Sequence, residues 1–332
     1  MKVAIYEKTA LLPELPPNTG YYHSRELMEL CEATPRQRPF MAVVTDDDGE
    51  VMACLLAIER RRRSWLPPYL YRHVRITGTG SYRESDTTTP QQSEAVSKNM
   101  LFSMMIDALT RRLGHRTLYM EVSNIQQKMF GYAPLRAAGY FPVRWMNIHN
   151  SLHSKAPEER ISKRLMKRIK YGIRHGVTTK TVETEQEFIA FMKLLRHHHW
   201  LKPRRYVPDD QFFRGMMEKN RCTLFLSQYN HHTVGCSCLV YAEDDAYLWY
   251  SASRRKSFAT LHPNAITFWN TIQYAHEKGC QHIRFMDVGL PFRRNPYRDF
   301  ILSFGGKEVS TFRWFRISIR CLNKIASWLW RE

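Results

Sequence analysis

The stretch "HPNAITFWNTIQYAHEKGCQHIRFMDVG", residues 262–289, is the part of the sequence that best indicates the fold. Its spacing of apolar residues predicts a helix over residues 264–279, and Gly279 ends that helix because glycine favours the position just past a helix C-terminus. Residues 282–289 then read as a β-strand that carries Asp287 shortly before Gly289. This stretch therefore has a characteristic order: a helix, a glycine, a strand and an acidic residue.

The same order occurs earlier in the chain. Residues 101–114 predict an amphipathic helix ended by a glycine, and the strand at residues 117–123 carries Glu121. A predicted hairpin precedes the first helix at residues 38–61, and a predicted three-stranded meander precedes the second at residues 222–253. This repeat predicts an α+β fold of two mixed, mostly antiparallel sheets flanked by helices, with domains at residues 1–155 and 156–316.

A basic helix is predicted between the two halves, in "RLMKRIKYGIRHGV", residues 164–177. Leu165, Ile169 and Ile173 recur every four residues, so we expect this stripe to seat the helix on a domain. Arg168 and Arg174 lie off the stripe, and we expect them to make the cleft between the halves positive. The alternative is a solvated helix face with no ligand.

Charge is the strongest compositional feature. The 332 residues include 50 Lys and Arg against 31 Asp and Glu, a net charge of +19, which favours an acidic partner such as nucleic acid, an anionic membrane or a phosphate-bearing substrate. No apolar run approaches the roughly 18 residues of a membrane span. Glu7 and Glu14 interrupt the N-terminal stretch, so we expect a cytoplasmic protein rather than an exported one.

Metal and disulfide chemistry are not expected. The seven cysteines form no paired CxxC pattern and are interpreted as reduced structural thiols. Three consecutive histidines, His197, His198 and His199, point in different directions on a helix, so they do not converge on one ion.

The ordered elements resemble the tandem GNAT-type acyltransferases of the Fem group, which form peptidoglycan bridges, and their BioF2-like acetyltransferase relatives. The resemblance rests on residues 168–177, on the 262–289 stretch and on "FILSFGG", residues 300–306. It implies two GNAT-like domains, with the first degenerate, and acyl transfer to an amine in the second. The family lysine falls on Ile301, and the helical hairpin thought to meet transfer RNA in many Fem ligases has no room in this chain.

The resemblance also implies where the chemistry takes place. In such folds two neighbouring strands splay apart, and here these are residues 246–253 and 282–289. Asp287 is then the candidate base for the amine, and Tyr250 the candidate proton donor to the leaving group. The alternatives are a carboxylate that caps the following turn and a tyrosine that fills the core.

Phosphate recognition has two candidate positions. The letters "RITGTG", Arg75–Gly80, fit the glycine loop of CoA-binding GNAT domains, but a helix does not follow at once, so acyl-CoA rests on a weak motif. The corresponding stretch of the second half has no glycine and offers cations instead. The predicted substrate-binding residues are Arg168, Arg174, Arg254, Arg255, Asn264, Arg293, Arg294 and Arg298.

Residues 317–332 predict a C-terminal amphipathic helix that packs back on the protein, with contact to an anionic membrane as the alternative. The sequence therefore predicts an N-acyltransferase acting on an amine of an acidic or phosphate-bearing substrate. The rival enzyme is a Fem-type ligase that uses aminoacyl-tRNA as donor. The rival of another class is a non-catalytic protein that binds nucleic acid or the inner face of a membrane. The acyl group, the amine and the oligomeric state stay open.

Overall fold

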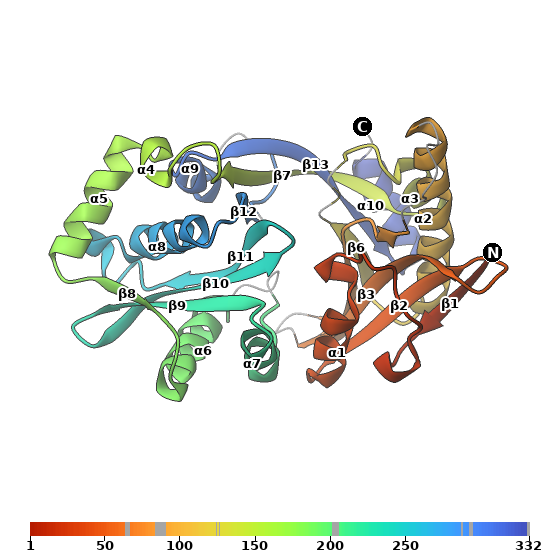
Figure 1. Ribbon diagram of the computed structural model, residues 1–332, viewed down its shortest axis with the longest axis horizontal. Coiled ribbons are helices and arrows are strands. Elements are labelled where there is room, and N and C mark those ends of the chain that lie inside the picture. The colour runs from red at the N-terminus through yellow and green to blue at the C-terminus, as the bar shows by residue number, and fades with distance from the viewer. Residues whose placement is uncertain are drawn as a thin grey trace. The chain divides into compact units, whose positions relative to one another are not determined.

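Two groups of β-strands with the same order account for much of the chain in the computed structural model (Figure 1). The structure describes residues 1–63, 67–83, 91–123, 125, 127–200, 206–286, 288–291 and 295–330, with the backbone alone for residues 91–97. Unit 1 comprises Met1–Trp145 together with Ser310–Glu332, and unit 2 comprises Met146–Val309.

Unit 1 contains a sheet in the order β1-β2-β3-β4-β6-β13. The strands are β1 (Lys2–Tyr6), β2 (Gln37–Thr45), β3 (Val51–Arg63), β4 (Leu70–Thr77), β6 (Tyr119–Ser123) and the end of β13 (Lys307–Ile317), with the short β5 (Ser81–Tyr82) paired to β3. The helices are α1 (Arg25–Ala33), α2 (Gln91–Leu113), α3 (Tyr132–Ala137) and α10 (Arg320–Leu329), and two short 3₁₀ turns lie at Thr9–Leu11 and Tyr21–His23.

Unit 2 repeats this arrangement in the order β8-β9-β10-β11-β12-β7. The strands are β8 (Thr178–Thr181), β9 (Cys222–Tyr229), β10 (His232–Ala242), β11 (Asp245–Ser253), β12 (His282–Phe285) and the end of β7 (Phe141–Ser151). The helices are α4 (Pro157–Arg160), α5 (Lys163–Arg174), α6 (Glu185–His199), α7 (Asp210–Glu218), α8 (Pro263–Glu277) and α9 (Pro296–Leu302), with a 3₁₀ turn at Ala259–Leu261.

The predicted fold class is confirmed, because both sheets are antiparallel except for one parallel pair, β4–β6 in unit 1 and β11–β12 in unit 2. The domain limits differ from the predicted 1–155 and 156–316. Trp314–Ile317 of β13 pair with Tyr119–Val122 in unit 1, and Ile148–Ser151 of β7 pair with β12 in unit 2. Each half of the chain therefore supplies the last strand of the other half's sheet.

Helices cover both faces of each sheet. In unit 2, α8 lies on one face, while α6 and α7 lie on the other (Figure 1). α8 buries Ile266 and Ile272 in a core with Leu239 and Leu248 of the sheet. The predicted helix 264–279 is α8, and Gly279 follows it in the left-handed region at φ 79°, as its sequence position predicts.

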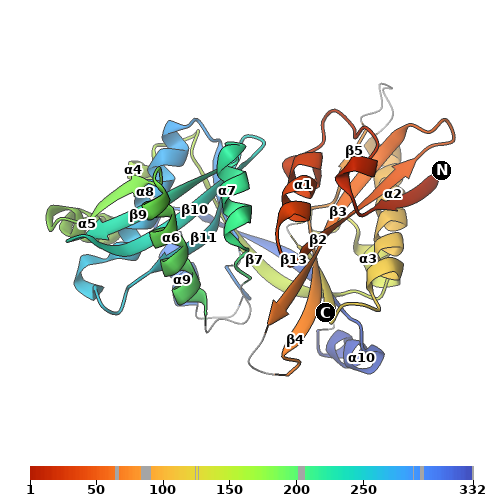
Figure 2. The same cartoon turned by 90° about the horizontal axis from the view of Figure 1, so that it is seen from below.

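The C-terminal helix α10 belongs to unit 1 and stands outside its sheet (Figure 2). It contains no buried residue, so the packing expected from its amphipathic sequence is limited to a few contacts. Asn323 makes two of them, donating to the carbonyl of Gly139 at 2.9 Å and accepting from the backbone N–H of Ile317 at 2.8 Å.

Candidate active site

The parallel strands β11 and β12 pair over only part of their length. Their register runs from Asp245 with His282 to Leu248 with Phe285, whereas β11 continues to Ser253. Over residues 250–253 the other edge of β11 remains paired with β10. Within the described part of the chain, the edge of β11 that faces β12 thus has no strand partner beyond Leu248, and its backbone groups are open to a ligand.

A pocket with a volume of about 1040 Å³ lies at this end of β11. Its lining comes from unit 2 alone, chiefly from α5, from the β11–α8 connection, from the start of α8 and from α9. The volume matches that of cavities which hold a cofactor-sized ligand. The side chains that carry charge or a polar group into it include Arg164, Arg168, Ser251, Arg255, His262 and Asp299.

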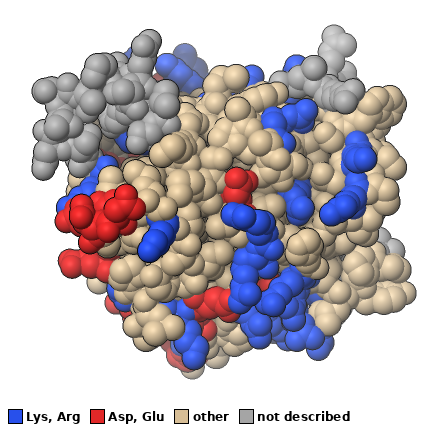
Figure 3. Space-filling model, turned by 90° about the vertical axis from the view of Figure 1, so that its right-hand side faces the viewer, with Lys and Arg blue, Asp and Glu red and all other residues tan. Residues whose placement is uncertain are grey.

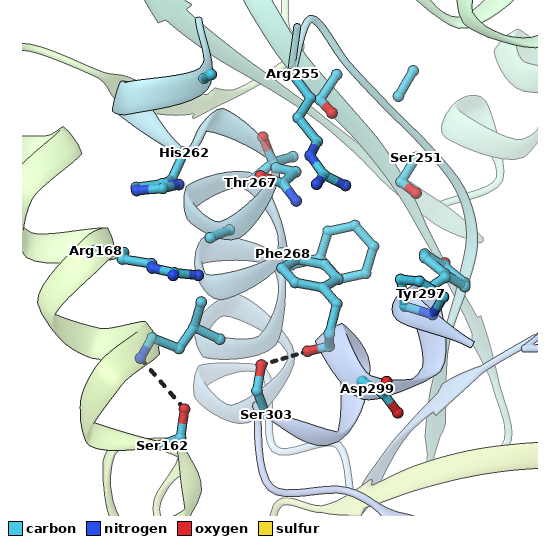
Figure 4. A pocket seen from close by; sticks show the side chains of 18 of the residues that line it. Ser162, Arg168, Ser251, Arg255, His262, Thr267, Phe268, Tyr297, Asp299 and Ser303 are labelled. Atoms are coloured by element: carbon cyan, nitrogen blue, oxygen red, sulfur yellow. Dashed lines mark hydrogen bonds between the residues drawn. The ribbon is translucent and has the colours of Figure 1, made fainter. Parts of the chain in front are cut away.

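The upper part of the pocket in Figure 4 is basic. Arg168 of α5 and Arg255 of the β11–α8 connection line it together with His262, the residue before α8. His262 has a left-handed backbone with φ 49°. Burial lowers the pKa of His262, and the charges of Arg168 and Arg255 lower it further. A neutral imidazole, two guanidinium groups and the N-terminus of a 15-residue helix form a set of donors suited to phosphate oxygens.

The lower part of the pocket in Figure 4 is formed by α9 and the start of α5, and it contains Asp299 and Ser303. Asn295 holds α9 in place, because its side chain accepts from the backbone N–H groups of Tyr297 and Arg298 and donates to the carbonyl of Val288 at 2.8 Å. Asp299 is solvent-accessible at the pocket wall. Its carboxylate suits a ligand ammonium group, which it can hold and deprotonate.

The buried face of the basic helix α5 differs from the predicted stripe of apolar residues. Leu165 and Ile169 are buried as expected, but Ile173 is 47% exposed and Gly172 takes the inward position. A Cβ at Gly172 would lie 2.3 Å from the carbonyl oxygen of Leu261. The close approach of α5 to the residues before α8 directs Arg168 into a pocket of unit 2.

The structure brings three of the predicted binding residues to this pocket, namely Arg168, Arg255 and Asn264. Arg174 is exposed on the last turn of α5 and does not line it. Arg254 is also absent from the lining, and Arg298 pairs with Glu308 at 3.2 Å. Asp287, Arg293 and Arg294 lie outside the described residues.

The predicted proton donor Tyr250 requires correction. Its side chain is 8% exposed and its ring packs edge-on against Phe213 of α7. Its hydroxyl donates to the carbonyl of Tyr206 at 2.8 Å. The residue fills the core on the face of β11 covered by α7, since alternate side chains of a strand point to opposite faces.

Sequence reasoning missed Arg164, His262 and Asp299. The pattern of a histidine followed by proline at the start of a helix marks the position of His262, but only the fold places the two arginines beside it. Asp299 lies in the short helix α9, and the direction of its side chain depends on how α9 packs. Ile301, the position of the family lysine, is fully buried in the core of unit 2.

The corresponding place in unit 1 is closed. β4 and β6 pair from His73 with Tyr119 to Thr77 with Ser123, and Gly78 N–H extends the pairing to the Ser123 carbonyl at 2.8 Å. The N–H of Gly80 donates to Nε2 of His23, whose pKa burial lowers to about 4. The glycines of "RITGTG" are therefore engaged within unit 1, and no strand opening like that of unit 2 exists there over the described residues.

The GNAT acetyltransferase domain model matches residues 160–294, which include α5, β11 and α8. This part of the chain is a GNAT-type domain. No protein of curated function matches it in sequence. The match covers α5, β11 and α8 of the pocket of unit 2 and ends before α9.

Solved structures share the tandem GNAT fold over nearly the whole chain. A crystal structure of FemX has a TM-score of 0.60 at 12% identity, covering 94% of this chain and 96% of that one. The C-terminal domain of a putative lysylphosphatidylglycerol synthetase from Agrobacterium fabrum has a TM-score of 0.57 at 10% identity, with 93% and 94% covered. A tandem GNAT protein from the clavulanic acid biosynthesis pathway has a TM-score of 0.51 at 10% identity, with 96% and 99% covered.

Proposed function

We propose that unit 2 transfers an acyl or aminoacyl group from a phosphate-bearing donor to an amine. The observation that carries this proposal is the position of the basic part of the pocket, which lies at the N-terminus of α8 and next to the unpaired end of β11. A donor can then place its phosphate at one end while its acyl chain runs along the open strand edge.

The phosphate end uses charge and the helix terminus together. Arg168 and Arg255 contribute guanidinium donors. The helix begins at Pro263, which has no N–H, and the N–H groups of Ala265 and Ile266 donate to the carbonyl of His262, so α8 contributes mainly the positive end of its dipole. Over residues 249–253, the backbone N–H groups that point away from β10 are the donors that we assign to the carbonyl oxygen of the acyl group. The negative charge that this oxygen gains when the amine attacks is stabilised by such donors.

The acceptor end uses Asp299. An amine attacks only when it is neutral, so its ammonium form must lose a proton. We assign that proton to the Asp299 carboxylate, which faces the pocket from α9. The amine nitrogen then bonds to the acyl carbon, and the bond from that carbon to the sulfur or oxygen of the donor breaks. The attacking nitrogen gives up a second proton in this step, and the leaving thiol or hydroxyl takes up that proton.

Two classes of donor carry both an acyl group and phosphates. Acyl-CoA has a pyrophosphate, and aminoacyl-tRNA has phosphodiesters next to its aminoacylated 3′ end. The net charge of +19 supports an acidic partner in either case. One of the similar structures is named as a putative lysylphosphatidylglycerol synthetase. Phosphate-bearing lipids are therefore among the acceptors to test.

Two substitutions on one helix test the phosphate end. We expect Arg168→Ala to raise the Kd for acetyl-CoA, or for an aminoacyl-tRNA, by about tenfold, because one charge-assisted contact is lost. The same change should reduce the dependence of binding on salt. Arg174→Ala removes an equal charge from the same helix outside the pocket, so it serves as the matched control.

Isothermal titration of both donors at two salt concentrations measures these effects. An Arg168→Ala protein that binds the donor as tightly as the wild type contradicts the placement of the phosphates, and so does an equal loss in Arg174→Ala. Tight binding of a donor that is never consumed with any amine favours the non-catalytic binding role.

A further inference from the structure

The C-terminal helix α10 exposes an apolar face. Five of the sixteen large apolar side chains that are exposed in the described chain fall within residues 319–329, which comprise α10 and the residue before it, so this face is a cluster rather than scattered exposure. They are Ile319, Leu322, Ile325, Trp328 and Leu329, and the exposed fraction is 55% for Ile325 and 65% for both Trp328 and Leu329. We refer to these five residues as the α10 face.

The attachment of α10 fixes the direction of this face. The partly buried side of the helix carries Asn323, Ala326 and Ser327, which are three and four residues apart and so lie on one side. Asn323 ties that side to Gly139 of unit 1. The side chains of the α10 face are 46–65% exposed, so this face points to solvent while the side that carries Asn323 is attached.

Cations flank the α10 face. Arg320 and Lys324 are exposed on the same helix, between the apolar arc and the attached side. Two residues before the helix, Ser318 donates its backbone N–H to the carbonyl of Leu118 at 3.1 Å. Leu118 lines a groove of about 380 Å³ in unit 1 that also contains Arg61, Arg72, Arg116 and the exposed Leu70.

The surface charge of this part of the molecule is uneven. On the face that Figure 3 shows, Lys and Arg side chains gather towards the right-hand and lower parts, whereas most Asp and Glu side chains lie towards the left. Residues 319–330 contain no acidic residue. An apolar strip beside cations is complementary to a surface that offers acyl chains beneath negative phosphates.

We infer that the α10 face, with Arg320, Lys324 and the arginine groove, docks unit 1 on an anionic lipid bilayer. The apolar side chains enter the boundary between headgroups and acyl chains, where tryptophan is favoured, and the cations contact lipid phosphates. None of the described helices is long and apolar enough to cross a membrane, so the contact is with the surface. A second copy of the chain fits less well, because a symmetric pair would oppose Arg320 and Lys324 to like charges.

Vesicle sedimentation tests this inference with the full chain. The wild type is expected to sediment with vesicles of phosphatidylcholine mixed with phosphatidylglycerol, and about tenfold or more weakly with phosphatidylcholine alone. Ile325→Glu should lower binding to the mixed vesicles by about tenfold or more, since it places a charge in the apolar strip. Ile189→Glu on α6 is the matched control, because Ile189 is 56% exposed and Ile325 is 55% exposed.

The remaining outcomes decide against the inference. It is wrong if the wild type fails to bind the mixed vesicles, or if Ile325→Glu binds them as well as Ile189→Glu does. It is also overturned if sedimentation velocity shows a dimer of the wild type that Ile325→Glu dissociates, because a second copy then covers the α10 face. Circular dichroism of both variants establishes that each is folded, and neither position is in the pocket of unit 2.

Discussion

Asp299→Asn is expected to lower the rate of acyl transfer by about 100-fold or more, the usual scale for the loss of a general base. Asparagine keeps the size of the side chain and leaves the bonds of the Asn295 cap unchanged, so α9 should stay in place. Because an amide neither holds an ammonium group as strongly nor takes its proton, the loss should appear in turnover more than in donor binding. Release of thiol from acetyl-CoA, or of tRNA from its aminoacyl form, in the presence of amines measures it.

Glu308→Gln is the control for this substitution. Glu308 is a nearby carboxylate that pairs with Arg298 and does not line the pocket, so its loss should change turnover by no more than about twofold. Asp287→Asn belongs in the same assay, because the sequence predicts Asp287 as the base. Full activity in folded Asp299→Asn together with a loss in Asp287→Asn would return the role of base to Asp287.

Gly172→Val is expected to destabilise unit 2 by roughly 2–3 kcal/mol, the scale of overpacking in a close-packed interior. The added Cβ would meet the Leu261 carbonyl oxygen at 2.3 Å and the Cδ1 atom of Ile266 at 2.6 Å. The helix α5 must then move away from the start of α8, and Arg168 moves with it. We therefore expect donor binding to weaken together with stability.

Denaturant unfolding and donor titration measure the two effects, and Ile173→Ala provides the comparison. The repeat of apolar residues in the sequence places Ile173 on the buried stripe, which predicts a loss of roughly 2–5 kcal/mol on truncation to alanine. The structure exposes Ile173, so we expect a change within about 0.5 kcal/mol. A large loss in Ile173→Ala with little change in Gly172→Val would show that α5 is rotated about its axis relative to the structure.

Part of the candidate site follows from the sequence. The stretch before residue 264 has a run of cations in place of a glycine loop, and this pattern indicates Arg255 and Asn264. The basic helix indicates Arg168. These three residues do line one pocket. His262 and Asp299 could not be selected in this way, because a single histidine or aspartate has the same appearance in sequence whether it faces solvent, a turn or a ligand.

Tyr250 shows the limit of the strand pattern. Its place on a strand expected to open towards a substrate suggests a functional role, yet successive side chains of a strand point to opposite faces. Which of those faces is covered by α7 depends on contacts with Phe213 and Tyr206, which are more than 30 residues away in the chain. The chemical type of a residue is local information, whereas the direction of its side chain is set by distant packing.

By itself, the sequence determined the order of the elements, the repeat of a mixed sheet in each half, the helix end at Gly279 and the basic charge of α5, because local periodicity and turn residues encode these features. Only the tertiary structure decided which strands complete each sheet, since β13 pairs with β6 and β7 pairs with β12 across long separations in the chain. Only the tertiary structure also decided that β11 and β12 separate after four paired residues while β4 and β6 stay joined. Backbone hydrogen bonds form between strands of nearly any sequence, so the choice of partner and the point of separation depend on the packing of the whole unit.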